Sequence, residues 1–184
     1  MIVAIHQPNF FPWLPFFEKV KQADVFVVLK HCQFEKNNYQ NRFEYQGRWH
    51  TMSVNKGLEP IERKTYVSYE KDWAKIKANL RNKKAVLEDF DECFGCSLYE
   101  TNHAIILKAM QKLEINTRVE CDWPTELVGT DRLVDICKAF NASTYLAGQG
   151  GKKYMDLSKF EEAGIKVEFQ TVSSEQSKHI LDIL

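Results

Sequence analysis

An apolar run, a helical stripe and a second apolar run constrain the fold of this chain more than any other feature. Residues 1–5 read MIVAI and residues 25–29 read VFVVL, as expected for parallel strands covered on both faces. The segment between them predicts a helix, with Pro12 in its first turn. Its apolar stripe is made of Trp13, Phe16, Phe17 and Val20. Together the three segments predict a βαβ unit with a right-handed crossover.

The last third of the chain repeats this rhythm. Helices are expected over residues 131–140 and 157–163, and strands over residues 117–121, 144–147 and 165–170. Gly164 suits the C-cap of the second of these helices. We therefore predict an α/β, Rossmann-like fold with a mostly parallel sheet and helices on both faces. A length of 184 residues fits a single domain over residues 1–184.

The middle of the chain is less regular. Residues 32–46 are polar and carry no clear period, whereas residues 48–54 and 64–69 resemble strands. Residues 73–90 and 98–113 predict helices, with Trp73 in the core. The end of the chain is apolar enough to pack back onto the domain, through Ile180, Leu181 and Ile183.

Composition excludes several classes of protein. Lys plus Arg and Asp plus Glu both number 25, which argues against a dedicated nucleic-acid binder. The sequence has neither an apolar run long enough to span a bilayer nor a signal peptide, so we expect a cytoplasmic protein without membrane insertion. The five cysteines then carry free thiols by default. Cys93 and Cys96 form a lone C-x-x-C motif between two helices, and we expect neither metal nor redox chemistry there.

The turn His6-Gln7-Pro8-Asn9 is the main candidate site. It follows the first strand, and ligands of open parallel sheets bind beyond the carboxyl ends of the strands. Its imidazole can serve as a general acid or base near neutral pH, and Gln7 and Asn9 can position a substrate. In the alternative interpretation His6 caps the strand and Gln7 bonds the backbone. Asn102 lies on the face of a predicted helix that points inward, where a buried amide can orient this turn.

The same turn opens the stretch HQPNFFPWLPFF (residues 6–17), which resembles the signature of the WbqC-like proteins. Further segments agree in order, namely ADVFV (23–27), QF (33–34), YQNR (39–42), RLVDIC (132–137), TYLAG (144–148), GGK (150–152) and Tyr154. The resemblance covers nearly the whole chain, with Pro15 standing where the family more often has glycine. It implies a role in bacterial O-antigen or other surface-polysaccharide pathways.

A weaker resemblance, in layout alone, connects the chain with pantothenate synthetase and the nucleotidylyltransferase superfamily. The shared order is strand, histidine turn, aromatic helix, Ala-Asp, apolar strand and Gln-Phe. In that enzyme the histidines after the first strand bind ATP phosphates, whereas this turn carries only His6. The resemblance implies ATP as a ligand, and the polysaccharide pathway implies a nucleotide-sugar; the sequence leaves the cofactor unknown.

Two further segments can contribute positive charge to such a ligand. Arg42 offers a planar fork for a carboxylate or phosphate, and Asn41 precedes it. The run GQGGKKY (148–154) follows a strand, so that Gly148, Gly150 and Gly151 can let a phosphate approach while Lys152 neutralises it and Tyr154 adds a hydroxyl. The alternatives are a surface ion pair for Arg42 and a tight strand-to-helix turn for the glycines. If the strands are neighbours, His6, Arg42 and Lys152 form one anion pocket.

These residues favour an enzyme of surface-polysaccharide precursor synthesis. It would be a transferase or an ATP-dependent ligase that adds a group to a nucleotide-activated amino sugar, and an adenylate is one route for this reaction. The expected catalytic residues are His6, Gln7 and Arg42. Because the sequence lacks a recognised nucleophile, metal site or carboxylate pair, the alternative is a non-catalytic binding or scaffolding protein of the same pathway. The expected partner is a small molecule, and the sequence carries no signal for an oligomeric state.

Overall fold

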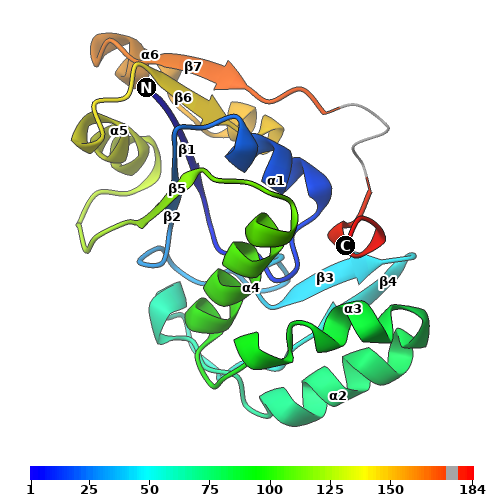
Figure 1. Cartoon of the computed structure of the whole chain (residues 1–184). Helices are drawn as coiled ribbons and strands as arrows, with labels where there is room; N and C mark the ends of the chain where they lie inside the picture. The colour runs from blue at the N-terminus through cyan, green and yellow to red at the C-terminus, as the bar shows by residue number, and fades with distance from the viewer. Residues whose placement is uncertain (173–177) are drawn as a thin grey trace. The chain divides into compact units, whose positions relative to one another are not determined.

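The computed structural model describes residues 1–172 and 178–184 as two compact units (Figure 1). Unit 1 contains residues 1–6, 15–29 and 115–172, and unit 2 contains residues 7–14, 30–114 and 178–184. The chain passes from one unit to the other between His6 and Gln7, inside the turn that the sequence singles out. Whether the chain behaves as one domain in solution stays a prediction.

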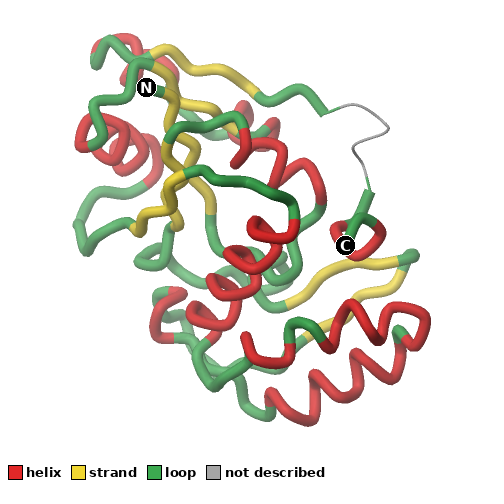
Figure 2. Tube along the Cα trace, viewed as in Figure 1, coloured by secondary structure: helices red, strands yellow, loops and turns green. Residues whose placement is uncertain are grey.

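Unit 1 is built on a five-stranded parallel sheet in the order β5-β2-β1-β6-β7. Its strands, yellow in Figure 2, are β1 (Ile2–His6), β2 (Val25–Val28), β5 (Arg118–Cys121), β6 (Thr144–Ala147) and β7 (Lys166–Phe169). Counted in chain order, these strands are arranged 3-2-1-4-5, which is the order of the Rossmann fold. The predicted fold class is therefore confirmed.

Helices cover both faces of this sheet (Figure 1). They are α1 (Leu14–Lys21), α5 (Gly129–Ala139), α6 (Leu157–Glu162) and the 3-10 helix η4 (Gln149–Lys153). Val3, Ile5, Val25, Val27 and Tyr145 share one face and pack in one core with side chains of α5 and α6. On the opposite face Phe26 contacts Phe16 of α1, with ring centroids 5.4 Å apart.

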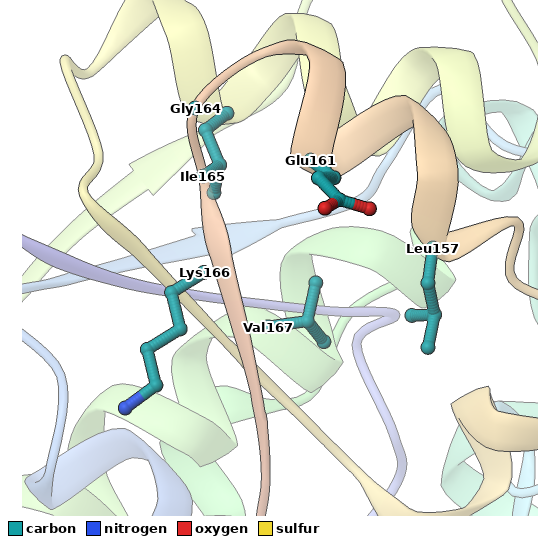
Figure 3. Close-up of a pocket in the computed structure, with 6 residues that line it drawn as sticks. All are labelled: Leu157, Glu161, Gly164, Ile165, Lys166 and Val167. Atoms are coloured by element: carbon teal, nitrogen blue, oxygen red, sulfur yellow. The ribbon is translucent and has the colours of Figure 1, made fainter.

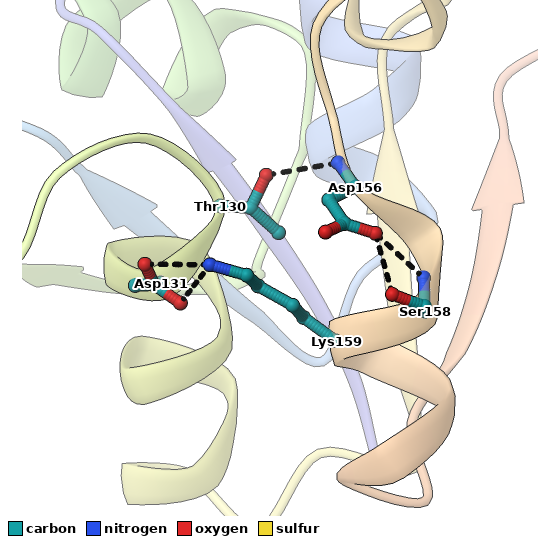
Figure 4. A network of polar contacts seen from close by, with 5 residues as sticks. All are labelled: Thr130, Asp131, Asp156, Ser158 and Lys159. Atoms are coloured by element: carbon teal, nitrogen blue, oxygen red, sulfur yellow. Dashed lines mark hydrogen bonds and ion pairs between the residues drawn. The ribbon is translucent and has the colours of Figure 1, made fainter.

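Polar contacts connect α5 with α6 at their first turns (Figure 4). Lys159 Nζ lies 2.7 Å from Asp131 Oδ1, and the Thr130 hydroxyl accepts a hydrogen bond from the Asp156 amide. Asp156 in turn accepts from the Ser158 amide and caps α6. At the other end of α6, Gly164 has φ +69° and serves as the predicted C-cap.

Helix α1 begins later than predicted. It starts at Leu14, so that Pro15 rather than Pro12 occupies the first turn, and Trp13 lies outside the helix. The indole is 49% exposed, and Trp13 forms an isolated bridge with His179. The prediction that Trp13 belongs to the buried stripe is therefore wrong, although Phe16, Phe17 and Val20 are buried as expected.

In unit 2 an antiparallel hairpin replaces part of the predicted irregular segment. Strands β3 (Arg42–Tyr45) and β4 (Arg48–Thr51) pair with Tyr45 opposite Arg48. The two residues of the connecting loop, Gln46 and Gly47, have φ +51° and +73°. This is the conformation of a type I′ turn, which the residues Gln-Gly favour less strongly than Asn-Gly.

The remaining elements of unit 2 are helices and short turns, namely η1 (Ile61–Arg63), α2 (Tyr69–Asn79), η2 (Arg81–Lys83), α3 (Lys84–Glu88), η3 (Asp91–Cys93), α4 (Leu98–Lys112) and η6 (Ile180–Asp182). Helix α4 matches its prediction. The expected single helix over residues 73–90 is wrong, because Leu80 leaves the helical region at φ −111° and ψ 53°. A strand over residues 64–69 is also wrong, since only the isolated bridges of Thr65 and Tyr66 form there.

The end of the chain packs onto unit 2 through Ile180 and Leu181 as predicted, whereas Ile183 is 42% exposed. Ile180 and Leu181 are each 1% exposed, and the Tyr45 hydroxyl donates a 2.6 Å hydrogen bond to Asp182. Lys83 Nζ lies 3.1 Å from the same carboxylate oxygen. Within the described residues, no helix is both long and apolar enough to cross a bilayer.

Candidate functional site

The order of the strands in unit 1 creates a topological switch point between β1 and β6. From β1 the chain proceeds to β2 and β5 on one side, and β6 and β7 lie on the other side. Ile2, Val3 and Ala4 pair with β6, so the two strands are direct neighbours. The carboxyl ends of these strands therefore bring together His6 and the loop that begins at Gly148, at the place where Rossmann-like sheets bind ligands.

His6 ends β1 and remains partly exposed. Its carbonyl accepts a 2.9 Å hydrogen bond from the Leu29 amide, which continues the ladder between β1 and β2. The imidazole packs edge-on against the ring of Phe16, with centroids 5.1 Å apart and planes at 79°. Helix α1 thus sets the position of the ring from one side.

The loop after β6 is packed at one glycine and open at two others. A Cβ atom on Gly151 would lie 2.9 Å from the end of the Met155 side chain, so a larger residue there would require this flexible side chain to move. Apart from the neighbouring residues of the chain, no described atom lies within 4 Å of a Cβ placed on Gly148 or Gly150. Gly150 is exposed and Gly148 is half-buried, so their backbone is at least partly accessible. The glycines at 148 and 150 therefore suit the approach of a ligand better than Gly151 does.

Other side chains of this loop are held in different ways. Lys152 Nζ lies 4.9 Å from the centroid of the Phe169 ring, and Tyr154 is 70% exposed. The amide of Gln149 donates to the carbonyl of Gln170. Gln170 is itself buried and donates a 2.7 Å hydrogen bond to the carbonyl of Pro15, in the first turn of α1. The loops after β6 and β7 are therefore tied to α1.

Lys19 is a buried amine that the sequence analysis missed. It is 2% exposed, and its Nζ donates a 3.2 Å hydrogen bond to the carbonyl of Ile5. This carbonyl lies one residue beyond the last pair of β1 with β6, Ala4 with Leu146. Burial lowers the pKa of Lys19 to about 7. The sequence signal was its position three residues after Phe16, on the buried face of α1.

In unit 2 the side chain of Gln7 is fixed at both ends of its amide. The Oε1 atom accepts a 2.7 Å hydrogen bond from Gln40, and the Nε2 atom donates over 3.2 Å to Glu35. Gln40 is fully buried, and its own Oε1 accepts from the Glu35 amide. A second amide, that of Asn38, donates to the Glu35 carboxylate over 2.6 Å. Sequence reasoning missed both Gln40 and Glu35 as partners of Gln7.

Asn102 of α4 connects the turn with this network. Its buried amide donates two 2.7 Å hydrogen bonds, to the carbonyls of Pro8 and Gln40, and its oxygen accepts from the Tyr66 hydroxyl. This agrees with the prediction that Asn102 points inward and orients the turn. Burial raises the pKa of Tyr66, so its hydroxyl stays protonated and donates.

The remaining predicted residues of unit 2 have local contacts. Asn9 is 8% exposed, and Asn41 donates a 2.7 Å hydrogen bond to the carbonyl of Met52. Arg42 donates to the carbonyl of Asn37, and its guanidinium carbon lies 4.0 Å from the centroid of the Trp49 ring. The Nε atom of Arg42 is buried and finds no acceptor within the described part of the chain.

The predicted residues therefore divide between the two units. His6, the glycine loop, Lys152 and Tyr154 belong to unit 1, whereas Gln7, Asn9, Asn41 and Arg42 belong to unit 2. The adjacency of β1 and β6 brings His6 and the glycine loop to the same edge. The shared anion pocket of His6, Arg42 and Lys152 stays a prediction.

Each unit contains a further group of polar or thiol side chains. Arg132 and Asp122 form an ion pair in unit 1 whose side chains are 9% and 1% exposed. The thiols of Cys93 and Cys96 are not joined in a disulfide, and burial raises the pKa of Cys93. In residues 1–172 and 178–184, no three or more His, Cys, Asp or Glu side chains cluster in a way that could hold a metal ion.

A pocket of about 420 Å³ lies on unit 1 between α6 and β7 (Figure 3). Its lining consists of Leu157, Glu161, Gly164, Ile165, Lys166 and Val167. Residues 164–166 lead into β7, so this part of the pocket lies at the amino end of that strand. None of the predicted site residues lines it, and the switch point lies at the opposite edge of the sheet.

Comparison with known proteins places this architecture in a family. A protein of Mycobacterium tuberculosis, named "Uncharacterized protein Rv1507c", is 28% identical over an alignment of 184 residues. The alignment covers 90% of this chain and 80% of that protein. No solved structure matches the chain significantly. The model of the WbqC-like protein family matches residues 7–179. The chain therefore belongs to the WbqC-like protein family.

Proposed function

We propose that this protein is an enzyme of bacterial surface-polysaccharide precursor synthesis that binds a nucleotide-activated amino sugar, or ATP, at the switch point of unit 1. The observation that carries the proposal is the adjacency of β1 and β6, whose carboxyl ends present His6 and the accessible backbone of Gly148 and Gly150. Family membership supports a polysaccharide-related role.

The chemistry that we propose is either the transfer of a group to the sugar amine from an activated donor, whose carrier leaves, or the ligation of a free carboxylate to that amine. His6 would take the proton that the amine loses as it attacks. Lys152 would stabilise the negative charge of a phosphate, and the amides of Gly148 and Gly150 would donate hydrogen bonds to it. In the ligase branch, a carboxylate attacks the α-phosphorus of ATP, pyrophosphate leaves, and the amine then displaces AMP. We also propose catalytic roles for Gln7 and Arg42, which belong to unit 2.

Calorimetry tests the binding step. We expect ATP or a nucleoside diphosphate amino sugar to bind the intact protein, and Lys152→Ala to weaken binding at least tenfold. Lys153→Ala is the matched control, because Lys153 is the next residue of η4 and is exposed as well. Equal affinities of the two variants would exclude the role of Lys152. If neither ligand binds the unmodified protein, the switch point is not a nucleotide site.

ATP–pyrophosphate exchange with candidate carboxylic acids tests the ligase branch. An exchange that depends on one acid and is lost in His6→Ala supports adenylation, with folding checked by circular dichroism. No exchange with any acid, together with calorimetric binding of a nucleotide-sugar alone, would leave transfer without an adenylate.

A non-catalytic binding or scaffolding role is the second candidate. The observation in its favour is that Gln7, Asn41 and Arg42 each donate hydrogen bonds to the protein itself, as structural residues do. The two candidates differ in cells that make the polysaccharide. Folded His6→Ala protein that supports normal polysaccharide output favours the scaffold, whereas loss of output favours the enzyme.

A further inference from the structure

Two exposed aromatic side chains and one arginine gather on the hairpin side of unit 2. Tyr39 is 49% and Trp49 is 43% exposed, and their ring centroids lie 5.4 Å apart with planes tilted by 49°. The Arg42 guanidinium lies over the Trp49 ring at 4.0 Å. We call these three residues the aromatic platform. Exposed apolar side chains that form one contiguous patch, as opposed to single scattered ones, can mark a binding site.

The platform is held rigidly by backbone contacts on both sides. Tyr39 donates its amide to the Asn38 side chain over 2.7 Å, and its carbonyl accepts from Phe10 over 2.8 Å. Trp49 lies on β4 opposite Glu44. A ligand that stacks on these rings would therefore meet a surface that is already ordered and would lose less entropy on binding.

Arg42 retains hydrogen-bonding capacity although it is fixed in place. Of its five N–H groups, one donates to the Asn37 carbonyl, and the buried Nε–H has no acceptor among the described residues. The guanidinium carbon lies 4.0 Å from the Trp49 centroid, and the N–H groups of Nη1 are the donors that an anionic group of a stacked ligand would use.

We propose that the aromatic platform of Tyr39, Arg42 and Trp49 binds a ring with a flat apolar face that carries a phosphate group, as found in a sugar phosphate or a nucleotide. The ring stacks on Tyr39 and the accessible part of Trp49, and the phosphate accepts hydrogen bonds from Arg42. The platform lies wholly within unit 2, so this proposal stands whether or not unit 1 binds a nucleotide.

The indole N–H signals in a two-dimensional ¹H–¹⁵N NMR spectrum of the full chain test the proposal. The chain has four tryptophans, and Trp49→Phe assigns the signal of Trp49. Titration with a hexose 1-phosphate and, separately, with uridine monophosphate distinguishes the two sources of a phosphate-bearing ring. We expect one of these probes to shift the Trp49 signal with a Kd of about 1 mM or tighter. Trp13, which is 49% exposed, is the internal control and should not shift.

Variants of arginine test the part of the proposal that concerns charge. Arg42→Lys should weaken binding of the same probe at least tenfold, because lysine lacks the planar fork. Arg48→Lys on the same hairpin is the matched control, since Arg48 is exposed, and it should leave the affinity unchanged. A Trp49 signal that responds to neither probe would overturn the proposal. Equal affinities of the two lysine variants would do so as well, and so would a self-association of the protein that Trp49→Ala abolishes.

Discussion

Replacement of Lys19 by methionine should remove a specific dependence of stability on pH. Burial lowers the pKa of this lysine from 10.5 to about 7. At about 1.4 kcal/mol per pH unit, that difference corresponds to about 5 kcal/mol in the free energy of unfolding. Lys19 is 2% exposed, and burial is the only resolved cause of the lowered pKa. Solvent therefore does not screen the effect.

The sign follows from counting bound protons. Below about pH 7 the amine is protonated in both states, and the folded protein bears the whole cost of a buried charge. Between about pH 7 and pH 10.5 the unfolded chain binds one proton more than the folded protein, so stability rises with pH. Above pH 10.5 the amine is neutral in both states and the cost is absent. From pH 7.5 to pH 9.5 the gain is about 2–3 kcal/mol.

Urea unfolding followed by circular dichroism measures this gain. We expect the stability of the unmodified protein to rise by about 2–3 kcal/mol relative to that of Lys19→Met as the pH rises from 7.5 to 9.5. The carbonyl of Ile5 loses its donor in the variant, but that loss is a constant offset at every pH. Lys21→Met is the matched control, because Lys21 is exposed in the last turn of the same helix. A stability difference between protein and variant that does not change with pH would refute the reasoning.

Three further substitutions test contacts elsewhere, each by chemical denaturation. Asn102→Ala leaves two buried carbonyls without a donor and should cost about 2–4 kcal/mol, and a loss below about 1 kcal/mol would show that water replaces the amide. Arg132→Met removes the cationic partner of the buried Asp122 carboxylate and should cost about 3–5 kcal/mol, part of which Asp122→Asn in the same chain should restore. Gly151→Ala should cost about 1 kcal/mol, because a flexible methionine must move, and Gly150→Ala should cost less; the reverse order would contradict the packing role.

Much of unit 1 could be predicted from the sequence because its signals are local. The apolar runs at residues 1–5 and 25–29 became β1 and β2, and the alternating elements after residue 117 became β5, α5, β6, α6 and β7. A strand buried on both faces appears in the sequence as a continuous apolar run, and a helix with one buried face appears as apolar residues at helical spacing. The positions of His6 and the glycine loop at strand ends followed from the same pattern.

Unit 2 was harder to predict because its elements depend on contacts between distant residues. The hairpin of β3 and β4 lies in a polar segment, and its turn requires two residues with positive φ, of which only Gly47 signals this directly. The helical period over residues 73–90 continues through Leu80, Leu87 and Phe90, which are all buried although the helix breaks at Leu80. Burial of side chains determines the spacing of the apolar residues, but that spacing does not require the backbone to stay helical between them.

The sequence by itself determined the α/β class, the turn after the first strand and the residue types available there. Only the tertiary structure decided which of those residues are partners: Gln7 with Gln40 and Glu35, Asn102 with Pro8, and Lys19 with the Ile5 carbonyl. The spacing of apolar residues along the sequence indicates a helix or a strand, because that spacing depends on residues close in the chain. Hydrogen bonds between residues 14 to 94 positions apart depend on how the elements pack, and no local pattern records that.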